Sequence, residues 1–178
     1  AALYVSALDE YGNRLISRPA HPLLKHGSVH VGTIRGGSAP SVYPDGCELV
    51  LERRTMPGER PDEVLHEFER ILDELREREG DVRASLEQML ERPGTEVPEE
   101  SRLVQGLLRA GRKHGISPVV EGMTAWVDAA LLNEVGIPAV CYGPGDIAQA
   151  HSADEWVEVE QIEKCADVLE SFARDLAT

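Results

Sequence analysis

One loop near the end of the chain holds the histidine best placed for chemistry. The run GPGDIAQAHSADEW, residues 143–156, contains two glycines, a proline and His151, with an acidic pair after it. Gly143 and Gly145 permit backbone conformations that other residues avoid, and Pro144 stiffens the turn. Such a loop can present His151 as a metal ligand. A lone loop histidine is more often solvated or capping, so the spacing by itself leaves both interpretations open.

An arginine pair offers a second kind of chemistry, the binding of an anion. Arg53 and Arg54 are adjacent in an expected strand, so their side chains should point to opposite faces of it. A guanidinium group binds a carboxylate through two parallel hydrogen bonds, which suits one of these arginines to an anionic ligand. Ordinary ion pairs with Glu48, Glu52 or Glu59 are the alternative, and the sequence does not decide between them.

The run EGMTAWVDAALLNEVGIP, residues 121–138, contains an acid and an aromatic residue for which structural roles suffice. Asp128 lies near the start of an expected helix, where an aspartate caps the free N–H groups. Trp126 is expected to pack rather than to stack on a ligand. The sequence contains no H-E-x-x-H, no G-x-S-x-G, no P-loop and no G-x-G-x-x-G motif.

Hydrophobic spacing predicts the elements that position these residues. Apolar residues three and four positions apart predict helices, and alternating ones predict strands. The expected helices are residues 2–15, 60–80, 101–114, 127–135 and 158–176, and the expected strands are residues 28–37, 47–56, 82–90 and 137–143. Val29, Val31 and Thr33 should share one face of the first strand. The loop of His151 would follow the last strand, at the end where open α/β sheets bind ligands.

The element order predicts two incomplete regions. Residues 1–92 read helix, strand, strand, helix, strand, which is the ferredoxin-like arrangement without its first strand. Residues 98–178 alternate helices with an apolar strand, as in an α/β layer. The run ERPGTEVPEE, residues 91–100, is the expected boundary between them. Because both regions lack strands for a complete sheet, and the chain has no initiator Met, we expect pieces of a longer protein.

Composition narrows the class of protein. The 178 residues are 42% hydrophobic, enough for a packed core, and no apolar run approaches the roughly 20 residues of a membrane span. The net charge of -14 argues against nucleic acid and anionic membranes as partners. Cys47, Cys141 and Cys165 fit neither a disulfide framework nor a zinc knuckle. We expect them to be buried reduced thiols in a cytoplasmic protein.

Two blocks of the sequence together resemble a known family. The first block is VHVGTIRGGSAPSVYPDGCELVLERRTMPGE, and the second, further along the chain, is GMTAWVDAALLNEVGIPAVCYGPGDIAQAHSADEWV. Their order and spacing resemble those of the acetylornithine deacetylase / succinyl-diaminopimelate desuccinylase / aminoacylase family of zinc metallopeptidases. The resemblance covers nearly the whole chain. It implies an α/β (α+β) fold, with residues 1–92 as a ferredoxin-like lid and dimerisation domain lacking its first strand. Residues 98–178 would be the C-terminal portion of the catalytic α/β domain.

The resemblance also implies roles for particular residues. His151 matches the last metal ligand of a site for two zinc ions, for which cobalt or manganese are alternatives. Arg54 matches the lid arginine that binds the substrate carboxylate. The residues that match segments of the substrate pocket are Thr124, Asp128, Gly143 and Gly145. The remaining ligands and the general base would lie upstream of this chain, so the general base has no match here.

Three departures from the family pattern bear on what the resemblance implies. Ser41 stands where the lid often has an asparagine, and Val127 stands where a threonine is common before Asp128. The lid motif G-H-[SA] of many members is absent from the sequence. The resemblance therefore supports the metal and carboxylate roles more strongly than an amide donor to the scissile carbonyl.

The expected function is metal-dependent hydrolysis of an amide bond next to a free carboxylate, as in an N-acyl amino acid deacylase or peptidase. The expected partners are a small N-acyl amino acid or peptide substrate and a second copy of the chain, bound through the lid. With one metal ligand, these 178 residues alone should be inactive. The alternative is a non-catalytic dimerisation or binding module derived from such an enzyme.

Overall fold

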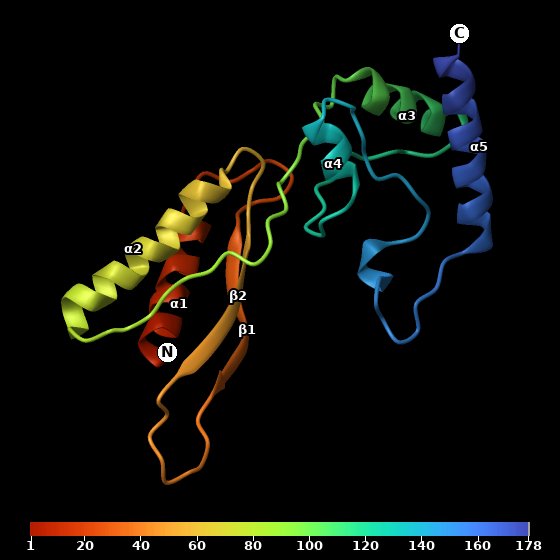
Figure 1. Cartoon of the computed structure of the whole chain (residues 1–178). Helices are drawn as coiled ribbons and strands as arrows, with labels where there is room; N and C mark the ends of the chain where they lie inside the picture. Colours follow the sequence, from red (N-terminus) through yellow and green to blue (C-terminus); the bar gives the residue numbers. More distant parts are fainter. Residues whose placement is uncertain (178) are drawn as a thin grey trace. The chain divides into compact units, whose positions relative to one another are not determined.

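A computed structural model describes residues 1–177, which pack as two units (Figure 1). The first unit is Ala1–Thr95 together with Gly122–Trp126, and the second comprises Glu96–Glu121 and the chain from Val127 on. The chain therefore leaves the first unit after Thr95, returns to it briefly, and leaves again after Trp126. The ranges 1–92 and 98–178 remain a prediction for the domains of the whole protein.

The first unit contains two helices and a two-stranded antiparallel hairpin. Helix α1 (Ala2–Ile16) precedes strands β1 (Ser28–Gly36) and β2 (Cys47–Arg54), and helix α2 (Pro61–Glu79) follows them. Proline at the first position and acidic residues in the first turn of α2 favour its start, and a glycine with positive φ ends it. These four elements confirm the order expected from the sequence.

The core of the first unit lies between the two helices and one face of the hairpin. In α1 the buried side chains recur every three or four residues, as its amphipathic pattern predicts. Tyr11 packs edge-to-face on Phe68 of α2, with ring centroids 5.7 Å apart. The buried members of this core are Tyr4, Leu8, Tyr11, Leu15, Val64, Phe68, Ile71, Leu72 and Leu75.

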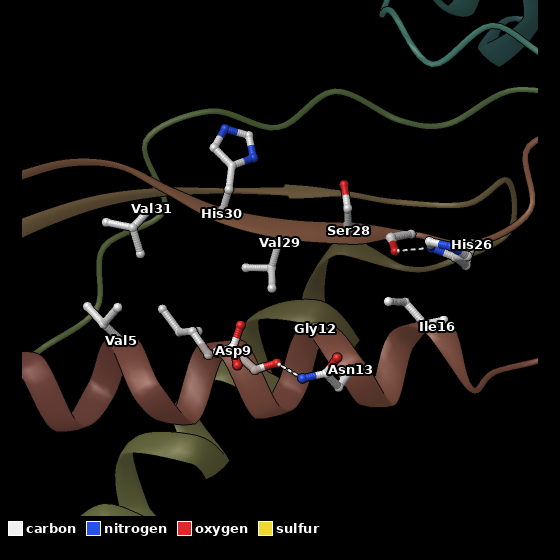
Figure 2. A pocket seen from close by; sticks show the side chains of 12 residues that line it. Val5, Asp9, Gly12, Asn13, Ile16, His26, Ser28, Val29, His30 and Val31 are labelled. Atoms are coloured by element: carbon white, nitrogen blue, oxygen red, sulfur yellow. Dashed lines mark hydrogen bonds between the residues drawn. The ribbon is translucent and has the colours of Figure 1, made fainter.

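A groove of about 320 Å³ lies between α1 and β1 (Figure 2). Val29 and Val31 point from β1 toward α1, whereas Ser28 and His30 point away from it, as alternation along a strand requires. A register shift between Val31 and Thr33 interrupts that alternation, and Thr33 pairs with Val50 on the face opposite to Val31. The expectation that Thr33 shares the face of the two valines was therefore wrong.

Two expected strands do not form. Residues 82–90 and 137–143 are assigned no strand, because a strand needs a paired neighbour and neither segment has one in the chain as described. Side chains satisfy part of their backbone instead. Arg76 Nη2 donates to the Ala84 carbonyl over 2.6 Å. The Asn133 amide donates to the Ala139 carbonyl over 2.9 Å and accepts from its N–H over 2.8 Å.

The expectation that the three cysteines are buried was also wrong. Cys47 and Cys141 are exposed, and Cys165 is half-buried. Cys47 pairs with Gly36 beside the connecting turn of the hairpin, among exposed residues that no helix covers (Figure 1). Cys141 lies in the segment that was expected to be a buried strand but pairs with nothing described. An apolar neighbourhood in the sequence therefore did not translate into burial at either position.

The second unit consists of helices joined by long irregular segments. Its elements are α3 (Arg102–Lys113), α4 (Ala129–Glu134), the short helix η1 (Ile147–Gln149) and α5 (Val159–Leu176). Helices α3 and α5 pack together, with an ion pair of 2.7 Å between Lys113 Nζ and Asp175. The expected helices of this region are thus confirmed. No helix in residues 1–177 has both the length and the apolar character needed to span a bilayer.

The contact between α3 and α5 generates a stability prediction. A Cβ added at Gly106 would lie 2.6 Å from Cε2 of Phe172, so Gly106→Ala should force the two helices apart. We expect the variant to lose about 1–2 kcal/mol of unfolding free energy, despite the better helix propensity of alanine. Urea denaturation measures the loss. The double variant Gly106→Ala/Phe172→Leu should recover part of it, and an unchanged midpoint for Gly106→Ala would contradict this packing.

Candidate functional site

Two neighbouring arginines at the end of β2 have different environments. The Arg53 side chain is 3% exposed, whereas that of Arg54 is 45% exposed. Arg53 donates from Nε to the Tyr11 hydroxyl over 2.9 Å and from Nη2 to Glu59 over 2.6 Å. The expected alternation of the two side chains is therefore observed. Arg53 is committed to the interior of the unit, and Arg54 is the member of the pair that a ligand can reach.

A network of charged groups surrounds Arg53. Glu59 accepts hydrogen bonds from Arg18 over 3.1 Å and from the Met56 N–H over 2.6 Å. Glu67 of α2 accepts from the Tyr11 hydroxyl and pairs with Arg18. These bonds join α1, α2 and the turn that follows β2. The strand end that carries Arg54 is thereby fixed to both helices of the first unit.

The network shifts the pKa values of its titratable members. Burial would raise the pKa of the Glu67 carboxyl, but hydrogen bonds from Tyr11 and Arg18 lower it below its usual value. Burial and the bond to Glu67 raise the pKa of Tyr11, against an opposing effect of Arg53. Glu67 is therefore held as a carboxylate and Tyr11 as a neutral donor. These are the protonation states that the hydrogen bond between them requires.

Arg54 contacts one other candidate site residue. Its Nη1 donates to the Thr124 carbonyl oxygen over 3.1 Å, and its Nε pairs with Glu52. A guanidinium carries five N–H donors, so these two contacts leave donors for a carboxylate ligand. Both expected roles of this arginine, surface ion pairing and anion binding, are therefore compatible with the geometry. Thr124 lies in the returning segment Gly122–Trp126, which belongs to the same unit.

The histidine loop lies in the second unit. After η1 the chain turns at His151, which has a positive φ of 65° and an exposed side chain. The His151 N–H donates to Glu155 Oε2 over 3.2 Å, and the Gly145 N–H donates to Gln161 of α5 over 2.8 Å. A left-handed backbone is uncommon for a residue with a side chain, so these bonds fix a conformation that a free loop would rarely adopt. The imidazole is thus presented to solvent from a loop held at both ends.

The other candidate residues of this unit are in more open surroundings. Asp128 occupies the N-cap position of α4, as expected, but its side chain makes no capping hydrogen bond. Asp128 therefore does not act as a helix cap through its side chain, and its exposed carboxylate is available for other contacts. Gly145 has a φ of 87°, which favours glycine. A Cβ at Gly143 would meet no atom within 4 Å, so close packing within this chain does not require glycine there.

Metal-ligating side chains do not cluster within the described part of the chain. Among residues 1–177 there is no group of three or more His, Cys, Asp or Glu side chains that could hold a metal ion. A structural or catalytic zinc site in a protein needs at least three such ligands. Within the described residues His151 can therefore contribute only one donor to a metal site. The structure brings Arg54 and Thr124 together, and the roles of all six candidate residues remain predictions.

Sequence reasoning found one of the groups that hold the arginine pair in place and missed two. Glu59 was among the acids expected to pair with Arg53 or Arg54, and its ion pair with Arg53 is observed. Tyr11 and Glu67, which complete the network from α1 and α2, were not expected to take part in it. Arg92 was also missed, although its guanidinium lies 4.7 Å from the centre of the Trp126 ring. No spacing rule connects residues this far apart in the chain.

Comparison with known proteins identifies the class to which the two units belong. The chain is a member of peptidase family M20/M25/M40, whose model matches residues 12–175. It is 34% identical to an acetylornithine deacetylase of Myxococcus xanthus over 142 residues, which cover 80% of this chain and 36% of that protein. It is 27% identical to a deformylase of Bacillus subtilis, N-formyl-4-amino-5-aminomethyl-2-methylpyrimidine deformylase, covering 96% of this chain and 44% of that protein. The resemblance found in the sequence is confirmed.

Solved structures agree with this assignment at the level of the fold. The aminopeptidase PepT from Bacillus cereus matches with a TM-score of 0.68 and 19% identity, over 96% of this chain and 45% of that one. A metallo-carboxypeptidase of the M20 family from Sulfolobus solfataricus matches with a TM-score of 0.60 and 16% identity, over 97% and 44%. The mixed α/β fold class is confirmed. The chain spans less than half the length of each of these four relatives.

The network around Arg53 generates a pH-dependent prediction. Because the pKa of Glu67 is lowered in the folded state from 4.5, its contribution to stability is present above that pH and is lost as the pH falls through the folded value. Tyr11→Phe removes the hydroxyl that donates to Glu67. We expect the variant to be about 1 kcal/mol less stable than the parent at pH 7, with a smaller difference at pH 3.

Urea denaturation at the two pH values measures this difference. Tyr43→Phe is the matched control, because Tyr43 is 97% exposed and should show no loss at either pH. A deficit of Tyr11→Phe that does not shrink toward acid would show that Glu67 is not the group to which Tyr11 is coupled.

Proposed function

We propose that this chain is part of a metal-dependent amide hydrolase that acts on N-acyl amino acids or small peptides. The observation that carries the proposal is the family match over residues 12–175, which includes both the arginine pair and the histidine loop. Relatives at 34%, 28% and 30% identity are named acetylornithine deacetylase, N-acetyl-L-citrulline deacetylase and putative succinyl-diaminopimelate desuccinylase. Those names share the removal of an acyl group from an amino acid.

Arg54 is proposed to bind the free carboxylate of the substrate. Its exposure, its position at the end of β2 and its remaining donors suit a planar carboxylate. Its neighbour Arg53 is unsuitable, because it is buried and already bonded to Tyr11 and Glu59. In this role Arg54 orients the substrate, so that the amide bond next to the carboxylate is the one presented for hydrolysis.

His151 is proposed to supply one ligand to the metal site of the full-length enzyme. The proposed metal is zinc, with cobalt or manganese as alternatives, and its other ligands and the general base would lie outside this chain. A bound zinc supplies Lewis-acid activation of water for attack on an amide carbonyl. Thr124, Asp128, Gly143 and Gly145 are proposed to line the substrate pocket, on the segments that hold Arg54 and lead to His151.

The proposed setting is a cytoplasmic homodimer formed through the first unit. The net charge of -14 disfavours nucleic acid and anionic lipid as partners. The second candidate function is a non-catalytic dimerisation or binding module. Metal analysis of the full-length protein separates the two, because the module would contain no stoichiometric zinc.

The metal role of His151 predicts the behaviour of one substitution. In the full-length enzyme, His151→Ala should remove at least one equivalent of bound zinc and lower kcat at least about 100-fold, since a missing ligand impairs both retention and positioning of the ion. Atomic emission on dialysed protein and a deacylation assay measure the two effects. His66→Ala is the matched control, because His66 is an exposed residue of α2 that pairs with Glu69. Full zinc content in His151→Ala would reject the assignment.

The carboxylate role of Arg54 predicts a different kinetic signature. Arg54→Ala should raise KM for an N-acyl amino acid roughly 10- to 100-fold, the loss expected for a charged hydrogen-bonded contact, with a smaller effect on kcat. Arg83→Ala serves as control, because the Arg83 side chain is 90% exposed and pairs with Asp81. Steady-state kinetics on the best substrate of an N-acyl amino acid panel provide the measurement. An unchanged KM would remove Arg54 from the substrate site.

A further inference from the structure

Within residues 1–177, Gly122–Trp126 is the only segment after Thr95 that belongs to the first unit. It is five residues long and is flanked on both sides by residues of the second unit. Such a short return must be held by strong local contacts, because it contains no helix or strand of its own. Three contacts hold it, and one of them is the bond to Arg54.

The first contact is close backbone packing at the start of the segment. A Cβ added at Gly122 would lie 2.8 Å from the Leu23 carbonyl oxygen and 2.8 Å from Cδ2 of Leu24. The second is the hydrogen bond of 3.1 Å from Arg54 Nη1 to the Thr124 carbonyl. The third is the Arg92 guanidinium over the Trp126 ring, 4.7 Å from its centre. Thr124 thus lies between two anchored residues.

Arg92 is itself tied to the region that carries Arg54. Two residues after it, a Cβ at Gly94 would lie 3.1 Å from the Met56 carbonyl carbon and 3.1 Å from the Pro57 nitrogen. The chain beside Arg92 therefore runs closely along the turn that follows β2. That turn begins directly after Arg54 and is bonded through Glu59 to Arg53. Arg92 and Arg54 are consequently both positioned by the turn that follows β2.

The Trp126 ring depends on its stack with Arg92. Its Nε1 is buried and has no hydrogen-bond partner in the described part of the chain. A buried indole N–H without an acceptor opposes burial of the ring, so packing and the cation–π contact must hold it in place. Loss of the guanidinium would release the end of the segment that carries the Thr124 carbonyl.

We propose that Arg92 and Trp126 form a positioning pair, which sets the direction of the Arg54 guanidinium through the Thr124 carbonyl and so sets the affinity for the substrate carboxylate. This inference rests on the proposed function, in which Arg54 binds that carboxylate. Neither member of the pair contacts the substrate. Without the Thr124 acceptor, Arg54 keeps only its pairing with Glu52 and must be ordered again each time a carboxylate binds.

Kinetics of the full-length enzyme test the positioning role. Arg92→Ala should raise KM about 5- to 10-fold for an N-acetyl amino acid, leave kcat within about twofold, and leave KM unchanged for the corresponding C-terminal amide, which lacks the carboxylate. Arg92→Lys should restore most of the affinity, because a lysine ammonium can also stack on an indole. The exposed Arg83→Ala again provides the control, with no change expected.

A double-variant cycle tests the route through Arg54. Once Arg54→Ala has removed the carboxylate contact, adding Arg92→Ala should raise KM no further, since both substitutions act on the same interaction. Tryptophan fluorescence gives a readout independent of activity. In a full-length background in which Trp126 is the sole tryptophan, with Trp156 and any other tryptophan replaced by Phe and the kinetics determined first, Arg92→Ala should shift the emission of Trp126 to longer wavelength, and Arg83→Ala should not.

The outcomes separate this inference from the proposed function. If Arg54→Ala raises KM but Arg92→Ala does not, the positioning pair is wrong and the carboxylate role of Arg54 stands. Equal effects of Arg92→Ala on the acid and the amide substrates, or additive effects with Arg54→Ala, also overturn the positioning pair. If Arg54→Ala leaves KM unchanged, the carboxylate role fails, and the inference fails with it.

Discussion

The first unit depends on the hydrogen bonds and the ion pair that the buried Arg53 guanidinium makes. A charge that is almost removed from water must be fully paired, and Arg53 is paired with Glu59 and the Tyr11 hydroxyl. Those partners come from the turn after β2 and from α1, and Glu67 extends the network to α2. The strand end is therefore fixed in position. Arg54, one residue further on, has an exposed side chain on a backbone that is held in place, as a binding residue requires.

The second unit uses backbone bonds for a similar purpose. Its histidine loop has little regular structure, yet side chains of Glu155 and Gln161 accept hydrogen bonds from the N–H groups of His151 and Gly145. These contacts hold an exposed imidazole on a backbone conformation that residues other than glycine seldom adopt. In both units, an exposed polar side chain, Arg54 or His151, is positioned by hydrogen bonds of the adjacent backbone and neighbouring side chains.

Periodicity in the sequence predicted the helices and the hairpin, because an amphipathic helix or a paired strand carries its own signal. The segments 82–90 and 137–143 failed as strands because strand formation depends on a partner that no local pattern reveals. Thr33 was misplaced because periodicity does not foresee a register shift. Alternation predicted that Arg53 and Arg54 point to opposite faces, but not which of the two is exposed. The contact of Arg53 with Tyr11 was not predicted, since the two residues are 42 positions apart in the chain.

The brief return of Gly122–Trp126 affects how this protein can be divided for experiments. A fragment ending at Thr95 would retain all four regular elements of the first unit and would look complete by its secondary structure. It would nevertheless lack the Thr124 carbonyl that accepts a hydrogen bond from Arg54, and the Trp126 ring on which Arg92 stacks. To express the first unit by itself with all its contacts, a linker should connect residue 95 to residue 122. The returning segment would then be part of one continuous domain.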